Sequence, residues 1–183
     1  VCVLVVSGLL TAGTRSYLRH WRTTESLTDY MMAVTPEAPQ PYNIRGVACA
    51  RAEDYDGAIA YFSKAIALNA DYTDAYNNRG NAWSQKGDPD RAIRDYTRAI
   101  ELKPNYVRAY TTHNDRGNAY GKKGNYEQAI RDFSRAIELN ADFAEGYYSR
   151  SVGWFYLKQY DRAWADLHTS RRLGATPKPA YVQ

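Results

Sequence analysis

The residue types that most often perform catalysis or bind metals are few and scattered in this sequence. They are two cysteines and three histidines: Cys2, Cys49, His20, His113 and His168. No pair of histidines has the short spacing of a metal site. Residues 121–124, GKKG, resemble a phosphate-binding loop only in composition, because they fall at the turn between two expected helices. We therefore predict no catalytic residues, no metal and no cofactor, and a protein that is not an enzyme.

Arginine and aspartate recur at fixed positions, which indicates either a binding surface or internal ion pairs. The arginines are Arg45, Arg79, Arg116 and Arg150, and the last three are each followed sixteen residues later by Asp95, Asp132 and Asp166. A row of arginines could bind a partner, but Arg–Asp pairing inside each unit explains both sets of residues and is preferred. Tyr61 takes the aspartate position after Arg45. Arg45 is therefore predicted to lack a partner.

Length and composition are those of a globular domain or a short repeat array. The chain has 183 residues, of which 44% are hydrophobic and 24% charged. Its net charge of +4 comes from charges that alternate in sign, as in RDYTRAIE, whereas a nucleic-acid-binding face gathers its basic residues. Nucleic acid is therefore not an expected partner, and an RNA-binding array is the least favoured function.

Four stretches of the sequence repeat one pattern. The alanines that open their second halves are Ala58, Ala92, Ala129 and Ala163, at spacings of 34, 37 and 34 residues. A period of 34 residues with helical patterning in both halves indicates stacked helix–turn–helix units. The turn at Gly87, Asp88 and Pro89 has the residues that end one helix, cap the next and start its first turn.

These stretches resemble tetratricopeptide repeats. The matching positions are an early aromatic (Tyr42, Tyr76, Tyr147), a glycine four residues later (Gly46, Gly80), also present as Gly117, and a second aromatic after the central alanine (Phe62, Tyr96, Phe133). The last repeat departs with Ser151 for glycine and Leu167 for the second aromatic. The resemblance implies an all-α fold, a right-handed α-solenoid of four repeats over residues 39–72, 73–106, 107–143 and 144–175.

The spacing of 37 residues reveals an insertion in the third repeat, at residues 111–113. Three residues rotate a helix by almost one turn. Either the first helix of this repeat starts a turn early, or the loop before it bulges. His113 lies in the insertion and is predicted to be a solvated loop residue.

The resemblance also implies a function, because the first helices of such repeats line a concave groove that holds a peptide or a partner's helix. The residues that this places in the groove are Asn43, Arg51, Asn77, Asn78, Asn81, Gln85, Asn114, Asn118, Lys122, Tyr148, Phe155 and Tyr156. An amide both donates and accepts hydrogen bonds, so the asparagines match a peptide backbone, although solvated or capping roles explain them equally well. Asp115 and Glu145 would repel a terminal carboxylate, so a chaperone-tail adaptor is not expected. We predict a non-catalytic scaffold or adaptor for a protein or peptide partner.

The alternative function is self-assembly into a homo-oligomer through the last repeat. Trp164 and Leu167 lie where a following repeat would cover them, and the chain runs instead into a tail, residues 176–183. An uncovered apolar face of this kind usually marks an interface.

The start of the chain is apolar and precedes the repeats. Residues 1–13 are almost wholly apolar and too short to span a bilayer. We expect residues 1–22 to be the remnant of a signal peptide or membrane anchor, and the alternative is a short helix packed on the first repeat. Residues 23–38 are expected to form an unpaired capping helix and a linker, because DYMMAV from Asp29 echoes DYTRAI from Asp95. An exported, periplasmic or membrane-tethered bacterial protein is preferred over a cytoplasmic one.

Overall fold

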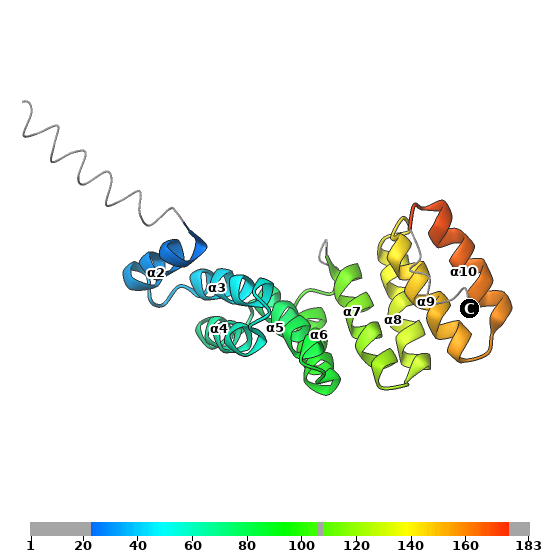
Figure 1. Ribbon diagram of the computed structural model, residues 1–183, viewed down its shortest axis with the longest axis horizontal. Coiled ribbons are helices and arrows are strands. Elements are labelled where there is room, and N and C mark those ends of the chain that lie inside the picture. The colour runs from blue at the N-terminus through cyan, green and yellow to red at the C-terminus, as the bar shows by residue number, and fades with distance from the viewer. Residues whose placement is uncertain (1–22, 106–107, 176–183) are drawn as a thin grey trace, which may run out of the picture. The chain divides into compact units, whose positions relative to one another are not determined.

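The computed structural model describes residues 23–105 and 108–175, and every regular element within them is an α-helix (Figure 1). The helices are α2 (Thr24–Val34), α3 (Pro39–Arg51), α4 (Tyr55–Leu68), α5 (Thr73–Gln85), α6 (Pro89–Leu102), α7 (Ala109–Lys122), α8 (Tyr126–Leu139), α9 (Ala144–Tyr156) and α10 (Tyr160–Arg172). The expected leader or anchor, residues 1–22, and the tail, residues 176–183, fall outside the described residues. Among the described helices, none is both long enough and apolar enough to cross a membrane.

The chain divides into two compact units, residues 1–75 and 76–183. In the first unit, α3 packs against both α2 and α4. In the second unit, α7 pairs with α8 and α9 with α10, while α6 packs on α7 and α8 on α9 (Figure 1). The predicted all-α solenoid of stacked helix pairs is therefore confirmed.

Side-chain caps fix where the second helices of the first three repeats begin. Asp54, Asp88 and Asn125 each accept a hydrogen bond from the backbone N–H three residues on, at 2.9, 2.9 and 3.2 Å. Gly87 and Gly124 stand just before two of these caps with φ of +79° and +75°, a conformation that favours glycine. The local chemistry of each turn thus separates the two helices of a repeat.

The core of each of the first three repeats is an aromatic ring pressed against a glycine. The pairs are Phe62 with Gly46, Tyr96 with Gly80, and Phe133 with Gly117. A Cβ atom on any of these glycines would lie within 2.7 Å of the ring, so the glycine is required by the close approach. In the last repeat Leu167 replaces the ring and Ser151 replaces the glycine. The smaller side chain of Leu167 thus accompanies the larger one of Ser151.

The predicted Arg–Asp pairs are confirmed, and two of the three arginines also contact the preceding repeat. Arg116 holds the carboxylate of Asp132 through two hydrogen bonds of 2.7 and 2.8 Å. Its remaining nitrogen, Nη1, donates to Thr97 Oγ1 of the preceding repeat at 3.0 Å. Equivalent pairs are Arg79 with Asp95 and Arg150 with Asp166, and Arg150 also donates to Ser134 Oγ at 3.1 Å.

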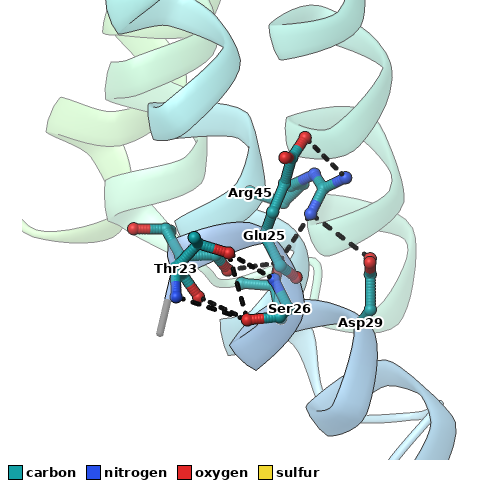
Figure 2. Close-up of polar contacts among 7 residues, drawn as sticks. Thr23, Glu25, Ser26, Asp29 and Arg45 are labelled. Atoms are coloured by element: carbon teal, nitrogen blue, oxygen red, sulfur yellow. Dashed lines mark hydrogen bonds and ion pairs between the residues drawn. The ribbon is translucent and has the colours of Figure 1, made fainter. Parts of the chain in front are cut away.

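Arg45 follows the same plan with different partners, so the prediction that it lacks a partner is wrong. Its guanidinium pairs with Glu25 and Asp29 of α2, both at 3.3 Å (Figure 2). It also donates to Thr28 Oγ1 at 3.1 Å. Because Tyr61 replaces the aspartate of this repeat, α2 supplies the missing negative charge.

Helix α2 therefore occupies the place of a preceding second helix. Thr28 receives the hydrogen bond from Arg45 that Thr97 receives from Arg116. The contact thus aligns Thr28 with Thr97, whereas the sequence similarity that starts at Asp29 aligns Met31 with Thr97, three residues later. A capping box starts the helix, since Thr23 Oγ1 accepts from Ser26 N at 3.0 Å and Ser26 Oγ accepts from Thr23 N at 3.3 Å (Figure 2).

Residues 111–113 are helical, and His113 is buried rather than solvated. Helix α7 begins at Ala109, so residues 111–113 lie within its first turns. His113 is 7% exposed, and its Nδ1 lies 3.2 Å from Asp132 Oδ1. It stands three residues before Arg116, where the other repeats have a tyrosine. The loop prediction is wrong because His113 lies within α7 at the tyrosine position, where it packs beside Asp132.

Candidate functional site

The second unit contains a polar pocket of about 550 Å3 formed by α5, α6 and α7. Its lining residues are Asn81, Ser84, Gln85, Tyr96, Asp115, Asn118 and Lys122. The structure thus brings together four of the residues predicted from sequence to bind a partner: Asn81, Gln85, Asn118 and Lys122.

Helical spacing explains why these four residues meet. Asn81 and Gln85 are four residues apart on α5, as are Asn118 and Lys122 on α7. Residues at this spacing share one face of a helix. All four are exposed, so the two faces present amides and an ammonium group to a ligand.

Hydrogen bonds inside the pocket fix the orientation of two of its groups. Tyr96 donates a hydrogen bond from its hydroxyl to Asn81 Oδ1 at 2.6 Å, and this bond fixes the orientation of the Asn81 amide. Lys122 donates from Nζ to the backbone oxygen and to Oγ of Ser84, both at 3.0 Å. The ammonium thereby lies at the C-terminal end of α5, where the helix dipole favours a positive charge.

Asp115 is the only carboxylate among the residues that line this pocket. Burial, and to a smaller extent the negative charge of Glu145, raise the pKa of Asp115 to about 7. Within the part of the chain that the structure describes, no cationic side chain forms an ion pair with Asp115. Its environment contrasts with that of Asp132, where burial opposes the charge but hydrogen bonds from Arg116 and His113 outweigh it and lower the pKa.

One helical turn before Asn81 and Asn118 lie Asn77 and Asn114, which were also predicted to bind. The Oδ1 atoms of both are buried and accept no hydrogen bond from the described residues. Asn114 is only 2% exposed. A buried carbonyl oxygen without a donor is costly, and here the same feature occurs at equivalent positions of two consecutive repeats.

The other predicted residues lie outside the polar pocket. Asn43 and Arg51 belong to α3 of the first unit, where Asn43 hydrogen-bonds the Tyr72 hydroxyl. Asn78 on α5 and Tyr148 on α9 are half-buried.

The two rings at the end of α9 have other neighbours. Tyr156 stacks on Tyr126, with ring centroids 4.5 Å apart and planes 6° from parallel. Phe155 contributes to a separate, apolar pocket of about 320 Å3. The asparagines and these rings therefore do not form one site within the second unit.

The apolar pocket lies between α9 and α10 of the last repeat. Its lining includes Phe155, Tyr160, Trp164 and Leu167. Trp164 is 60% exposed, whereas Leu167 is 9% exposed. Of the two residues predicted to mediate self-association, Trp164 is thus the accessible one, while Leu167 is largely covered.

Sequence reasoning did not select Ser84, Tyr96 or Asp115 as binding residues. Tyr96, which matches the second aromatic of the repeat pattern, is 1% exposed, but its hydroxyl reaches the pocket. Asp115 belongs to a first helix that is expected to line the groove, and its charge is expected to repel a terminal carboxylate. Asp115 directly precedes the recurring arginine of its repeat, as Asn78 does in the second repeat. This shared position was the sequence signal that could have identified Asp115 as a binding residue.

The described residues contain no group of three histidine, cysteine, aspartate or glutamate side chains that could hold a metal ion.

Similarity to known proteins supports the repeat architecture. A family model for the tetratricopeptide repeat matches residues 73–106 and 110–143, and a TPR repeat model matches residues 46–87. No curated protein sequence gives a significant match to the chain.

Solved structures with the same fold include MamA and YrrB. One MamA structure has a TM-score of 0.74 and 19% sequence identity, over 88% of this chain and 92% of that chain. A second MamA structure has a TM-score of 0.72 and 18% identity, over 92% and 93% of the two chains. YrrB, described as a TPR protein with an unusual peptide-binding site, has a TM-score of 0.70 and 20% identity, over 92% of this chain and 82% of that chain. At this level of identity the likeness concerns the fold.

The family models together match residues 46–106 and 110–143, more than half of the sequence. The matched residues include the ring–glycine contacts of the first three repeats. The chain therefore belongs to the tetratricopeptide repeat family, whose repeats form protein-interaction scaffolds.

Proposed function

We propose that the polar pocket between α5 and α7 binds an extended segment of a partner protein, and that the chain acts as a non-catalytic adaptor. The observation that carries this proposal is the convergence of Asn81, Gln85, Asn118 and Lys122 on one pocket. These residues come from two successive first helices, so a bound segment would contact both repeats.

The chemistry of the pocket suits a polypeptide backbone. Asparagine and glutamine amides donate and accept hydrogen bonds, as peptide units do. YrrB, which shares the fold, has a peptide-binding site by its description, and this supports a peptide as the ligand.

The test is retention of a degenerate pool of short peptides on the immobilised full chain. A double variant, Gln85→Ala with Asn118→Ala, removes two exposed amides from the pocket without emptying the core. Each hydrogen bond is worth about 0.5–1.5 kcal/mol, so retention should fall by about tenfold.

Gln128→Ala is the matched control, because it removes an amide from α8, outside the lining of the pocket. It should retain the pool as the unmodified chain does. Equal retention by the double variant and the control would overturn the proposal.

A second candidate function is self-assembly through the last repeat. The apolar pocket beside Trp164 favours it, because Trp164 and Tyr160 are 60% and 57% exposed around that pocket. Large exposed apolar patches commonly mark contacts between proteins. We propose that a second copy of the chain occupies this surface, so that the last repeats of the two copies bury these rings against each other.

A further inference from the structure

The charge of the polar pocket indicates more than backbone binding. Asp115 places a carboxylate among amides and hydroxyls, and Glu145 lies near enough to influence its protonation. The residues at the same place in the other repeats are Ile44, Asn78 and Ser149, each just before its arginine. The acid is thus a specific feature of the third repeat.

The cations nearest in sequence are already occupied. Arg116, the next residue, holds Asp132 with two hydrogen bonds and Thr97 with a third. Lys122 lines the same pocket, but its ammonium is bound to Ser84. Among the described residues, the Asp115 carboxylate is left without a positive partner.

Asn114, the neighbour of Asp115 in the sequence, is 2% exposed and does not itself line the pocket. Its Oδ1 atom accepts no hydrogen bond from the described residues. Asn114 lies one turn before Asn118, which lines the pocket. An acceptor buried to this degree calls for a hydrogen-bond donor.

We propose that this pocket recognises a lysine or arginine side chain of the bound segment, with Asp115 as its counter-charge and Glu145 as a second acid nearby. The inference rests on the proposed function and specifies the partner as a segment with a basic residue. Lysine and arginine carry only donors, so they satisfy a carboxylate and amide oxygens together. A terminal carboxylate would meet like charge instead.

The burial of Asp115 is consistent with this role. Its raised pKa means that the free pocket holds a carboxyl group that ionises readily when a cation arrives. Burial that disfavours the lone charge also strengthens its attraction to a cation, because the local dielectric constant is lower than that of water. A basic side chain would therefore bind and displace the proton.

The test uses two small probes on the full chain, followed by NMR of the side-chain amides of Asn81, Asn118 and Gln85. One probe is Nα-acetyl-lysine N-methylamide, and the other is its neutral Nε-acetyl derivative. The charged probe should bind at least about fivefold more tightly than the neutral one. Asp115→Asn, which copies Asn78 of the second repeat, should abolish this preference. Glu127→Gln removes an exposed acid from α8 with the same change in net charge and should preserve it.

Equal binding of the two probes, no binding of either at their solubility limit, or a preference retained in Asp115→Asn would each overturn the inference. Sequencing the peptides retained from the degenerate pool separates this outcome from failure of the proposed function. Retention without enrichment of lysine or arginine would leave the peptide-binding site in place and remove the basic specificity. Retention of no peptides would remove both.

Discussion

At the scale of single residues, burial of Asp115 lowers the stability of the fold, while the same carboxyl group is proposed to bind a basic side chain. The carboxyl group lies in the pocket and has no cationic partner among the residues that the structure describes, and burial and Glu145 raise its pKa to about 7. An unfolded aspartate has a pKa of about 3.9. The folded chain therefore retains a proton that the unfolded chain loses between about pH 4 and pH 7.

This difference predicts a pH-dependent loss of stability. Because the folded state binds more protons in this window, the contribution of Asp115 to the free energy of unfolding falls as the pH rises from about 4 to 7. Asp115→Asn should remove that contribution. Urea unfolding should show the variant to be more stable than the unmodified chain at about pH 8, and nearly equal to it at about pH 4. The same difference in stability at both pH values would contradict the assignment.

The contact of Gly117 with Phe133 gives a second prediction at this scale. Gly117→Ala places a Cβ atom 2.6 Å from the ring, so it should destabilise the chain by about 1–3 kcal/mol. Phe133→Leu reproduces the smaller side chain that the last repeat has at Leu167. The double variant should therefore cost less than the sum of the two single changes, as chemical denaturation of all three variants can measure. Strict additivity would show that the ring and the glycine do not constrain each other.

At the scale of elements, the docking of α2 is the feature that depends most on charge. Two carboxylates of α2, Glu25 and Asp29, hold Arg45 of α3 (Figure 2). The Arg45 side chain is 15% exposed, so losing both acids leaves a poorly solvated positive charge. This helix is therefore expected to open more readily than α3 or α4 when the acids are removed.

The variant that tests this is Glu25→Gln with Asp29→Asn. Hydrogen exchange of the α2 amides should become faster by about tenfold, whereas exchange in α8 should not change. Glu37→Gln, an exposed acid in the linker between α2 and α3, is the control and should leave α2 protected. Unchanged exchange in the double variant would show that packing alone holds α2.

The positions of the elements could be predicted from sequence because their determinants are local and repeated. Caps such as Asp88 and turn glycines such as Gly87 act within a few residues. The two errors concern residues whose partners depend on how helices pack. Arg45 has partners on α2, a helix outside the repeats, and His113 of α7 lies beside Asp132 of α8.

The candidate site was predictable to the extent that it follows helical spacing. Asn81, Gln85, Asn118 and Lys122 were selected as residues of first helices and do line one pocket. Tyr96 and Ser84 were missed because their roles depend on the direction of a hydroxyl group. The relation of Asp115 to Glu145 joins two repeats, and no spacing in a single repeat reveals it.

At the scale of the whole molecule, the exposed rings of the last repeat predict self-association. Light scattering on size exclusion at two concentrations should show a dimer that Trp164→Glu dissociates. Ile44→Glu, which places the same charge at an exposed position in the first unit, should leave the dimer intact. A monomer at both concentrations would contradict self-assembly without affecting the proposed peptide site.

The central claim is that a partner segment lies against α5 and α7, and site-specific photo-crosslinking tests it most directly. A benzophenone amino acid is placed at position 118 in one full-length chain and at position 128 in another, and each is irradiated with the peptide pool. We predict peptide adducts from position 118, reduced by Gln85→Ala, and few from position 128. Equal labelling at both positions, or labelling at position 128 alone, would contradict the account.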